Sequence, residues 1–436
     1  MGKQNETKKR GYLTGKEIRK IAKDNAKVIK ACEKYKNRRA DESEFTTKMR
    51  DDKNILEIEE LNTYFFTEQG VVKAVNGVSY DVPKNATVGI VGESGCGKSV
   101  TSMSVMRLIQ GPQGQITSGS IRFKAYDYKR DAKGKLIPIY EKNEDGSIVQ
   151  DEVQTKKGLK VVPRQKVNAL GEKQYESEEK VYDIAKMPIS EIHRIRGKQI
   201  AMIFQEPMTS LNPVFTIGQQ LDEVTFIHVP GATKEMAKAK SMEMLNLVGI
   251  AMPERVYKAF PHELSGGMRQ RVMIAMALAC NPRLIIADEP TTALDVTIQA
   301  QILDLLRDLK TKIDGSILLI THDLGIIAEM ADYVVVMYAG RVIEKGTVSE
   351  IFHNPMHPYT IGLQKSKPTL DSNTETLFNI PGNVPNPVNM PSYCYFKERC
   401  SMTCDKCNGD YPPMIRVSPT HFVACHRYVE KEEQNG

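Results

Sequence analysis

The sequence has no apolar run that approaches the roughly 18 residues that a helix needs to cross a bilayer. Its first positions, MGKQNETKKRGYLTGKE, are basic but lack an apolar stretch behind them, so no secretory signal is expected. We therefore expect a cytosolic chain, where a reducing glutathione pool disfavours structural disulfides. A length of 436 residues is too great for one ordinary core and predicts one large domain with appendages, or two to three units.

The basic excess lies in an N-terminal arm. Residues 1–53 hold 17 Lys and Arg against 9 Asp and Glu, a net charge of +8, whereas the whole chain carries +6. Within the arm, apolar residues from Lys16 to Tyr35 recur at roughly helical spacing. The arm is either an interfacial helix drawn to anionic lipid or a solvated, partly disordered extension, and we favour the extension.

A glycine-rich motif predicts a phosphate-binding loop. Residues 86–99 read ATVGIVGESGCGKS: an apolar run, then Gly-x-x-x-x-Gly-Lys-Ser, followed by a helical-looking stretch. Strand, glycine loop and helix form the context that such a loop requires, and a glycine turn with a chance lysine is the alternative. Lys98 would reach the phosphates and the Ser99 hydroxyl would bind Mg²⁺. The expected nucleotide contacts are Gly92, Glu93, Ser94, Gly95, Cys96, Gly97, Lys98, Ser99 and Val100.

A second motif, PRLIIADEPTTALD at 282–295, supplies acidic residues. Four consecutive apolar residues indicate a strand buried on both faces of a parallel sheet. Asp288 at its end would hold Mg²⁺, and Glu289 at the mouth would polarise an attacking water. Together with the phosphate loop, this motif predicts a nucleotide triphosphatase with a mixed α/β core.

The stretch LSGGMRQ, at 264–270, resembles the signature motif of ATP-binding-cassette (ABC) ATPases. A serine hydroxyl and glycine N–H groups at a helix start can bind a γ-phosphate. The resemblance implies an α/β fold with a RecA-like phosphate-loop core, an antiparallel β subdomain and a helical subdomain. It also implies that the signature contacts the ATP of a partner cassette through Leu264, Ser265, Gly266, Gly267 and Gln270.

Other family elements follow in the expected order. Gln205 in IAMIFQEP looks like the residue that senses Mg²⁺, water and the membrane partner. Ala293, Leu294 and Asp295 resemble the loop that crosses the dimer interface, and His322 in LLITHD resembles the switch histidine at the γ-phosphate.

Phe65 lies where the family places an aromatic residue on adenine. Stacking needs only a π-face, so Tyr64 or Phe66 is the alternative.

One phosphate loop and one signature are present, and we see no internal repeat, so the resemblance implies that the chain dimerises. The motifs in residues 203–221, 260–279, 288–303 and 354–363 look like those of ATPase subunits of oligopeptide and dipeptide importers. That resemblance implies a second, related ATPase, two membrane permeases and an extracellular or periplasmic peptide-binding protein. It places the chain at the cytoplasmic face of the membrane and implies no nucleic-acid partner.

Three rival functions have to be compared with this interpretation. A soluble cassette acting on ribosomes or DNA would have a second fused cassette or long coiled coils, and neither is seen. A non-catalytic module is disfavoured by the intact Lys98, Asp288, Glu289 and His322. An importer of the same architecture for nickel or another small solute stays open, because the ATPase does not touch the cargo.

The expected organisation is a basic N-terminal extension at 1–53, an ABC ATPase domain at 54–350 and a C-terminal extension at 351–436. Lys98 and Gln205 are 107 positions apart, which is longer than the family spacing and indicates an insertion at about 125–185. Its short alternating patches predict hairpins that project from the antiparallel subdomain. We favour a tolerated surface excursion, and a regulatory or partner-binding role is the alternative.

Five of the eight cysteines lie in the C-terminal extension, which is rich in Pro and Asn and has too little apolar material for its own core. Clustered cysteines in a cytosolic chain predict a metal site. Cys404 and Cys407 have the spacing of a zinc knuckle. The importer ATPases carry a [4Fe–4S] cluster on a pattern that corresponds to Cys394, Cys400, Cys407 and Cys425, so we favour the cluster over Zn²⁺ or free thiols. Cys404 then has no assigned role.

Overall fold

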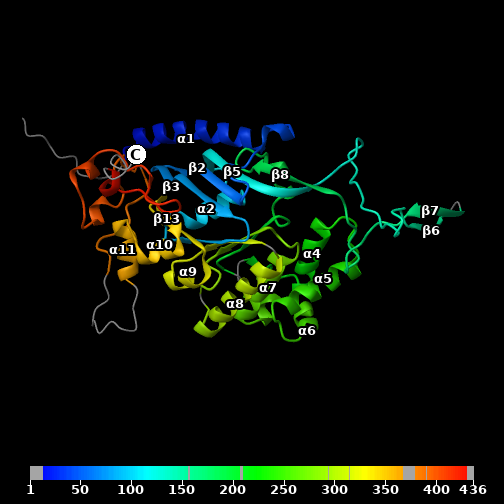
Figure 1. Ribbon diagram of the computed structural model, residues 1–436. Coiled ribbons are helices and arrows are strands. Elements are labelled where there is room, and N and C mark those ends of the chain that lie inside the picture. Colours follow the sequence, from blue (N-terminus) through cyan, green and yellow to red (C-terminus); the bar gives the residue numbers. More distant parts are fainter. Residues whose placement is uncertain are drawn as a thin grey trace, which may run out of the picture.

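The computed structural model describes residues 13–155, 158–206, 210–292, 294–313, 315–366, 379–388 and 390–429. Two large sheets and a group of helices form the body, an arm projects on one side, and the C-terminal segment lies on the opposite side (Figure 1). No helix in the described ranges has the length and apolar character needed to cross a membrane.

The larger sheet has eight strands and a parallel centre. Residues of its central strands are almost all apolar and buried, as expected for strands covered on both faces. In the order of the sheet the strands are β14 (Ile415–Arg416), β15 (Phe422–Val423), β13 (Arg341–Thr347), β12 (Tyr333–Tyr338), β4 (Thr87–Val91), β11 (Ser316–Ile320), β10 (Leu284–Asp288) and β9 (Ile200–Ile203). The run from β12 to β9 is parallel, so the carboxyl ends of β4, β10 and β11 share one edge.

The second sheet is antiparallel and packs against the first. Its strands, in order, are β1 (Thr46–Thr47), β8 (Ser177–Asp183), β5 (Gly114–Tyr128), β2 (Asn54–Thr67) and β3 (Gly70–Pro83). β1 belongs to the stretch that the sequence assigned to the N-terminal extension. The pairing of Thr46 with Tyr182 therefore joins that extension to the sheet.

The helices fall into three groups. One follows the parallel strands: α2 (Lys98–Val105), α8 (Val296–Ile313) and α9 (Leu324–Met330). The second forms a helical subdomain in the lower part of Figure 1: α4 (Ile217–His228), α5 (Lys234–Leu247), α6 (Pro253–Lys258) and α7 (Gly266–Leu278). The third follows β13: α10 (Val348–His353) and α11 (Pro358–Lys365).

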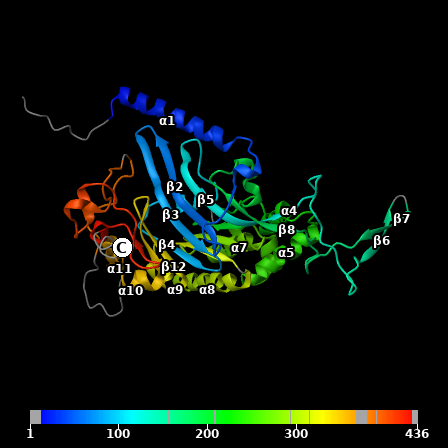
Figure 2. The ribbon, with the colours of Figure 1, turned by 45° about the horizontal axis from the view of Figure 1, so that its top comes forward.

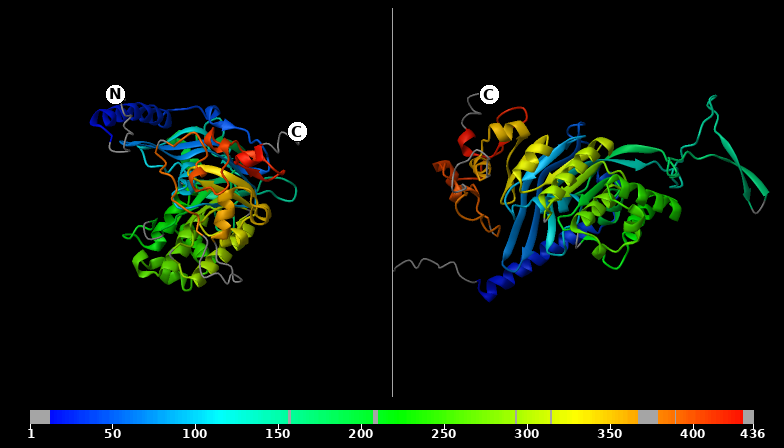
Figure 3. Two further views of the ribbon diagram at one scale, coloured as in Figure 1. Left: turned by 90° about the vertical axis from the view of Figure 1, so that its left-hand side faces the viewer. Right: turned by 90° about the horizontal axis from the view of Figure 1, so that it is seen from below.

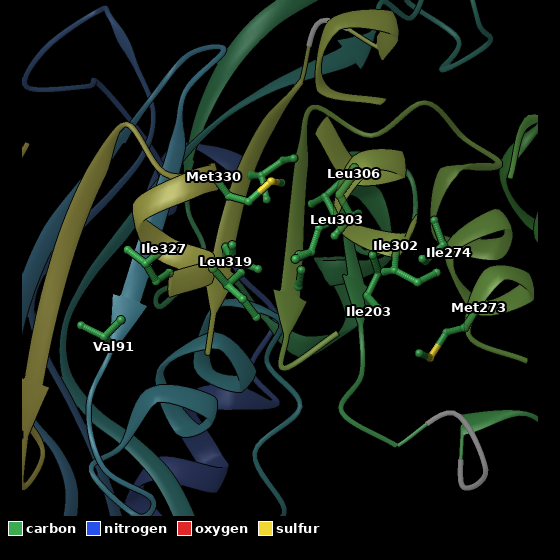
Figure 4. Packing of buried hydrophobic residues seen from close by; sticks show 14 of the residues in the cluster. Val91, Ile203, Met273, Ile274, Ile302, Leu303, Leu306, Leu319, Ile327 and Met330 are labelled. Carbon is green, nitrogen blue, oxygen red and sulfur yellow. The ribbon is translucent and has the colours of Figure 1, made fainter. Parts of the chain in front are cut away.

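The main apolar core joins the helical subdomain to the parallel sheet. Ile302 and Leu306 of α8 lie between strand residues such as Ile203 and Leu319 and the α7 residue Ile274 (Figure 4). All five side chains are fully buried. This packing fixes the start of α7 relative to the strand ends.

Helix α1 (Gly15–Lys36) lies along the antiparallel sheet (Figure 2). Thr14 and Glu17 form a capping box at its start. Asn25 is buried, and its Nδ2 donates to the Thr67 carbonyl at 2.9 Å. The expectation of a partly disordered extension is therefore wrong for the described residues, because the helix packs its half-buried side against the sheet.

The insertion forms an arm that extends away from the body beside α4 and α5 (Figures 1 and 3). Its outer part is the hairpin of β6 (Gln150–Thr155) and β7 (Gly158–Pro163). Closer to the body, three extended segments meet at each of three successive junctions. One residue from each segment takes part, and the backbone N–H of each donates to the carbonyl of another, so that the three hydrogen bonds form a closed cycle. The junctions are Lys129–Ile137–Glu176, Ile139–Lys166–Gln174 and Glu141–Val149–Arg164.

This arm contains an internal repeat, which the sequence-based expectation missed. A short hairpin turn leaves each junction, and each turn has the pattern Asp/Asn-x-x-Gly, at 131–134, 143–146 and 168–171. The glycines at its end all have positive φ. The repeat was not visible as sequence similarity because only the turn residues are shared.

The C-terminal extension docks on the edge of the parallel sheet through β15, which pairs with β13. Glu344 of β13 is fully buried and accepts hydrogen bonds from Met356 N at 2.7 Å, His357 N at 2.9 Å and His421 Nε2 at 2.8 Å. One carboxylate thus joins the sheet to two separate segments of the extension, one at Met356 and His357 and one at His421.

We predict that Glu344→Gln destabilises the protein by about 3 kcal/mol, because one buried acceptor for several donors is lost. The change is measured as a fall in Tm together with faster proteolysis of the C-terminal extension. Glu398→Gln is the matched control, since that side chain is 74% exposed. Equal Tm values for the two variants would contradict the role of Glu344.

Candidate nucleotide-binding site

Three strand ends bring the predicted catalytic residues together. The phosphate loop follows β4, Asp288 ends β10, and His322 comes just after β11, which lies between them. Because parallel strands end at the same edge, residues almost 200 positions apart in the sequence meet there.

The phosphate loop has the close backbone approach that glycine allows. A Cβ on Gly92 would lie 2.2 Å from the Met337 carbonyl oxygen, and one on Gly97 would lie 2.3 Å from the Ala74 carbonyl oxygen. Gly95 has a φ of +78° but no atom near its missing Cβ. The first two glycines are thus required by space, and Gly95 by backbone conformation.

Lys98 begins α2 and is 5% exposed. Its Nζ donates to the carbonyl oxygens of Gly92 at 2.8 Å and Glu93 at 3.2 Å, so the ammonium lies inside the loop. Cys96 is fully buried, and burial raises the pKa of its thiol. Its side chain therefore fills space in the loop as a neutral group.

Asp288 and Ser99 face each other across the site. Ser99 Oγ donates to Asp288 Oδ1 at 3.0 Å. Burial raises the pKa of Asp288 to about 6, while the hydrogen bond from Ser99 and the charge of Lys98 oppose the rise. A hydroxyl and a buried carboxylate are oxygen ligands of the kind that Mg²⁺ prefers.

Glu289 lies at the centre of a polar group. Its Oε2 accepts from Gln205 Nε2 at 3.0 Å and from Thr292 Oγ1 at 2.9 Å, and its Oε1 lies 3.4 Å from His322 Nδ1. The backbone of Glu289 has a φ of +46°, a left-handed conformation that is rare outside glycine. The strained turn points this carboxylate at the same edge as Asp288.

Phe65 is half-buried in β2, with its ring close to Gly114 at the start of β5. Of the two alternatives, Phe66 is 7% exposed, and the Tyr64 hydroxyl is engaged with Asn62 and Asn76. Phe65 is therefore the one of the three rings that is partly exposed and has no hydroxyl engaged by another residue.

The signature residues begin α7, where Ser265 caps the helix by accepting from Met268 N. With the loop before α8, they line a pocket of about 390 Å³. Its lining residues are Ser265, Gly266, Gly267, Met268, Arg271, Leu294, Asp295 and Ile298. None of residues 92–99 lines it.

Two signature residues, predicted to contact the ATP of a partner cassette, have side chains buried inside their own chain. Leu264 is 6% exposed, and Gln270 is 2% exposed with its Nε2 on the Pro290 carbonyl. These two side chains support the loop from inside the chain. Asp295 Oδ1 accepts from Ile298 N at the start of α8, and Ala293 lies outside the described residues.

The C-terminal cysteines gather in one region. Cys407 and Cys425 are buried and Cys404 is exposed. Cys394 interacts electrostatically with Cys400, Cys407 and Cys425, and burial raises the pKa of Cys394 and of Cys425 to about 11.

The clustered free thiols of this extension are ligands that fit a thiolate-bound group. However, Cys404 Sγ lies 3.6 Å from Cys407 Sγ. Cys404 is therefore close to one of the four predicted cluster ligands, although the sequence analysis assigned it no role. Within the described ranges, no three His, Cys, Asp or Glu residues are already arranged around a single metal position.

Two contributions were missed by sequence reasoning. Thr292 Oγ1 donates to Glu289, and its place in DEPTTALD was a signal, since a hydroxyl lies three residues after the acidic pair ends at Glu289. The second is Arg399, whose guanidinium pairs with the side chain of Glu93 in the phosphate loop. No motif connects these two residues, which are 306 positions apart.

Comparison with known proteins agrees with this geometry. The ABC transporter family model matches residues 75–177 and 167–292, and the model of the oligopeptide/dipeptide transporter C-terminal region matches 343–407. The oligopeptide transport ATP-binding protein OppD of Bacillus subtilis is 46% identical over 85% of this chain and 87% of its own length. The dipeptide transport ATP-binding protein DppD of the same organism is 42% identical over 85% and 94%.

Among solved structures, the dimeric ATP-binding cassette MJ0796 bound to ADP and Pi aligns with a TM-score of 0.49 and 21% identity, over 67% of this chain and 98% of that one. From the sequence relatives and family models, the chain belongs to the ABC transporter ATPases, and within them to the ATP-binding proteins of oligopeptide and dipeptide transporters.

We predict that Gly97→Ala and Gly95→Ala weaken MgADP binding to different degrees. Gly95→Ala costs about 1 kcal/mol for the left-handed conformation alone, or roughly fivefold in Kd. Gly97→Ala adds a clash with the Ala74 carbonyl and should abolish measurable binding. Isothermal titration calorimetry provides both values, and equal affinities of the two variants would show that this loop geometry is wrong.

Proposed function

We propose that this chain is the ATP-hydrolysing, energy-coupling subunit of a membrane importer for oligopeptides or dipeptides. The observation that carries the ATPase role is the position of Glu289, held by Gln205 and Thr292 next to His322. The peptide assignment is supported by family membership, in particular by the matched C-terminal region.

In this proposal Glu289 orients and deprotonates the attacking water. Two donors, Gln205 and Thr292, bond Oε2 of its carboxylate, and Oε1, which has only the long 3.4 Å contact with His322, is the oxygen proposed to accept from the water. His322 is 65% exposed on the solvent side of this carboxylate, where it can hold the γ-phosphate geometry. Lys98 exchanges its bonds to loop carbonyls for bonds to the phosphates.

A divalent cation fits next to the loop. Ser99 and Asp288 are proposed to hold Mg²⁺ directly or through water. The Gln205 amide, which donates to the neighbouring Glu289, is proposed as a further Mg²⁺ contact. When bound, Mg²⁺ supplies charge neutralisation for the phosphate oxygens. The raised pKa of Asp288 reflects a buried carboxylate for which such a cation would compensate.

We further propose that two cassettes share each ATP. Ser265, Gly266, Gly267 and Asp295 line a cavity that includes no phosphate-loop residue of their own chain. A γ-phosphate bound to the loop of a partner would enter it, with the start of α7 providing N–H groups. The proposed partner is a second, related ATPase.

The proposed contact with the two membrane permeases lies on the surface near Gln205. Large exposed apolar side chains are Val214 and Phe215, in the segment that leads from Gln205 to α4, and Ile227 near the end of α4. Exposed apolar residues of this size are characteristic of interaction surfaces. In this arrangement the chain works at the cytoplasmic face of the membrane, and a peptide-binding protein delivers cargo on the other side.

For the cysteines, we propose a [4Fe–4S] cluster on Cys394, Cys400, Cys407 and Cys425, with Zn²⁺ as the alternative. Support comes from the mutual proximity of four thiols in an extension without its own core. A bound cluster would cross-link the extension. The contact between Cys404 and Cys407 makes Cys404 the rival ligand.

We predict that Glu289→Gln in the assembled transporter lowers ATP hydrolysis by at least about 100-fold, because the general base is lost. Uptake of a labelled tripeptide should fall in parallel, whereas ATP still binds. The exposed α6 residue Glu254 offers the control Glu254→Gln, which should keep both activities.

Near-normal hydrolysis by Glu289→Gln would contradict the catalytic assignment. Uptake of Ni²⁺ without uptake of the tripeptide would contradict the peptide assignment and favour the small-solute alternative.

We predict that anaerobically purified protein contains about four iron and four sulfide per chain, as a [4Fe–4S] cluster requires. Cys407→Ser should lose both, and Cys404→Ser should keep them, as judged by iron and sulfide analysis and visible absorption. Stoichiometric zinc without sulfide would contradict the cluster, and loss of iron in Cys404→Ser would assign that residue as a ligand.

A further inference from the structure

Arg399 is the most unusual charged residue of the C-terminal extension, because it is 8% exposed. It ends a short 3₁₀ turn, η4 (Lys397–Arg399), directly before Cys400. Its Nη1 and Nη2 donate to the two carboxylate oxygens of Glu93 at 2.7 and 3.0 Å. This is the bidentate geometry of a strong arginine–carboxylate pair.

The rest of the guanidinium is also bonded. Nε donates to the Pro381 carbonyl at 2.9 Å, and Nη1 lies 3.3 Å from the Tyr338 hydroxyl. Ordering an arginine side chain costs conformational entropy. Because these bonds within the chain already fix Arg399, that cost does not have to be met when nucleotide binds. The extension therefore presents a pre-organised cation to the phosphate loop.

Glu93 lies at the turn of the loop, and each of its polar groups is held. Its N–H donates to the Tyr359 hydroxyl at 2.8 Å, its carbonyl accepts from Lys98 at 3.2 Å, and its carboxylate accepts from Arg399. Two of the three partners, Tyr359 and Arg399, lie after residue 350. The loop is thus bound to the C-terminal segment by both main chain and side chain.

An aromatic cluster fixes this connection in place. The rings of Tyr338, Tyr359 and Phe396 are 4.7 to 5.4 Å apart, and all three are buried. Tyr338 ends β12 of the sheet, Tyr359 belongs to α11, and Phe396 directly precedes η4. A shift of the extension would therefore move Arg399 relative to the loop.

We propose that Arg399 is a positioning residue of the ATP site, through which docking of the C-terminal extension controls the affinity for nucleotide. The inference rests on the proposed ATPase function and adds a control element to the same site. Arg399 holds the loop turn at Glu93 and neutralises a carboxylate that would otherwise repel the phosphates.

This mechanism makes a specific double-mutant prediction. Arg399→Met leaves the Glu93 charge unpaired beside the loop, so Kd for MgADP and KM for ATP should rise about tenfold, the effect of losing a charge-assisted bond. The kcat should stay within about twofold, because the groups around Glu289 are unchanged. Glu93→Gln removes the repulsive charge and should restore part of the affinity in the double variant.

Calorimetry with MgADP on the full-length chain and ATPase kinetics on the assembled transporter measure these values. Lys397→Met is the matched control, because that lysine is in the same turn and its carboxylate neighbour is Glu398 at 3.9 Å. If Arg399→Met does not fold, Arg399→Lys keeps the charge without the bidentate pair and should show an intermediate loss.

A purely structural role for Arg399 would lower Tm without changing Kd for MgADP, and that result would overturn the proposal. Failure of Glu93→Gln to restore any affinity would overturn it as well. A wild-type transporter that binds MgADP but does not hydrolyse ATP would contradict the proposed function instead, so the two failures are distinguishable.

Discussion

Parallel pairing of β4, β11 and β10 makes the three strands end at one edge, and every group of the candidate phosphate and cation site is positioned from that edge. Strand register in the parallel sheet sets Ser99 opposite Asp288 and brings Glu289 to His322. The buried α8 residues hold α7 and its signature serine at a fixed place relative to this edge. Phosphate, cation and water chemistry therefore come from loops on a rigid scaffold.

The C-terminal extension is a structural part of the nucleotide site. It adds strands to the parallel sheet, packs Phe396 against both Tyr338 and Tyr359, and reaches the phosphate loop through Arg399. A segment with little apolar material is ordered by docking on an existing core. A thiolate-bound group in this segment would stand one residue from Arg399, at Cys400.

In its described residues the insertion also has no apolar core of its own, but it is held together in a different way from the C-terminal extension. Its arm has few buried side chains and is built instead from cyclic backbone hydrogen bonds and repeated turns. The arm leaves the antiparallel sheet between β5 and β8. These two strands pair without a break as far as Tyr128 of β5 and Ser177 of β8, where the arm begins. The phosphate loop and the acidic pair lie at the edge of the other sheet, which explains how so long an excursion is compatible with intact motifs there.

The fold class, the strand–loop–helix of the phosphate loop and the candidate catalytic carboxylates could be predicted from the sequence. These follow from local patterns, in which glycine spacing and buried apolar runs dictate backbone geometry. The packing of α1, the turn repeat in the arm, the burial of Leu264 and Gln270, and the pair of Arg399 with Glu93 were decided only by tertiary structure. Such contacts join residues hundreds of positions apart, and pairing at that range depends on how the sheets and extension pack, which no local pattern encodes.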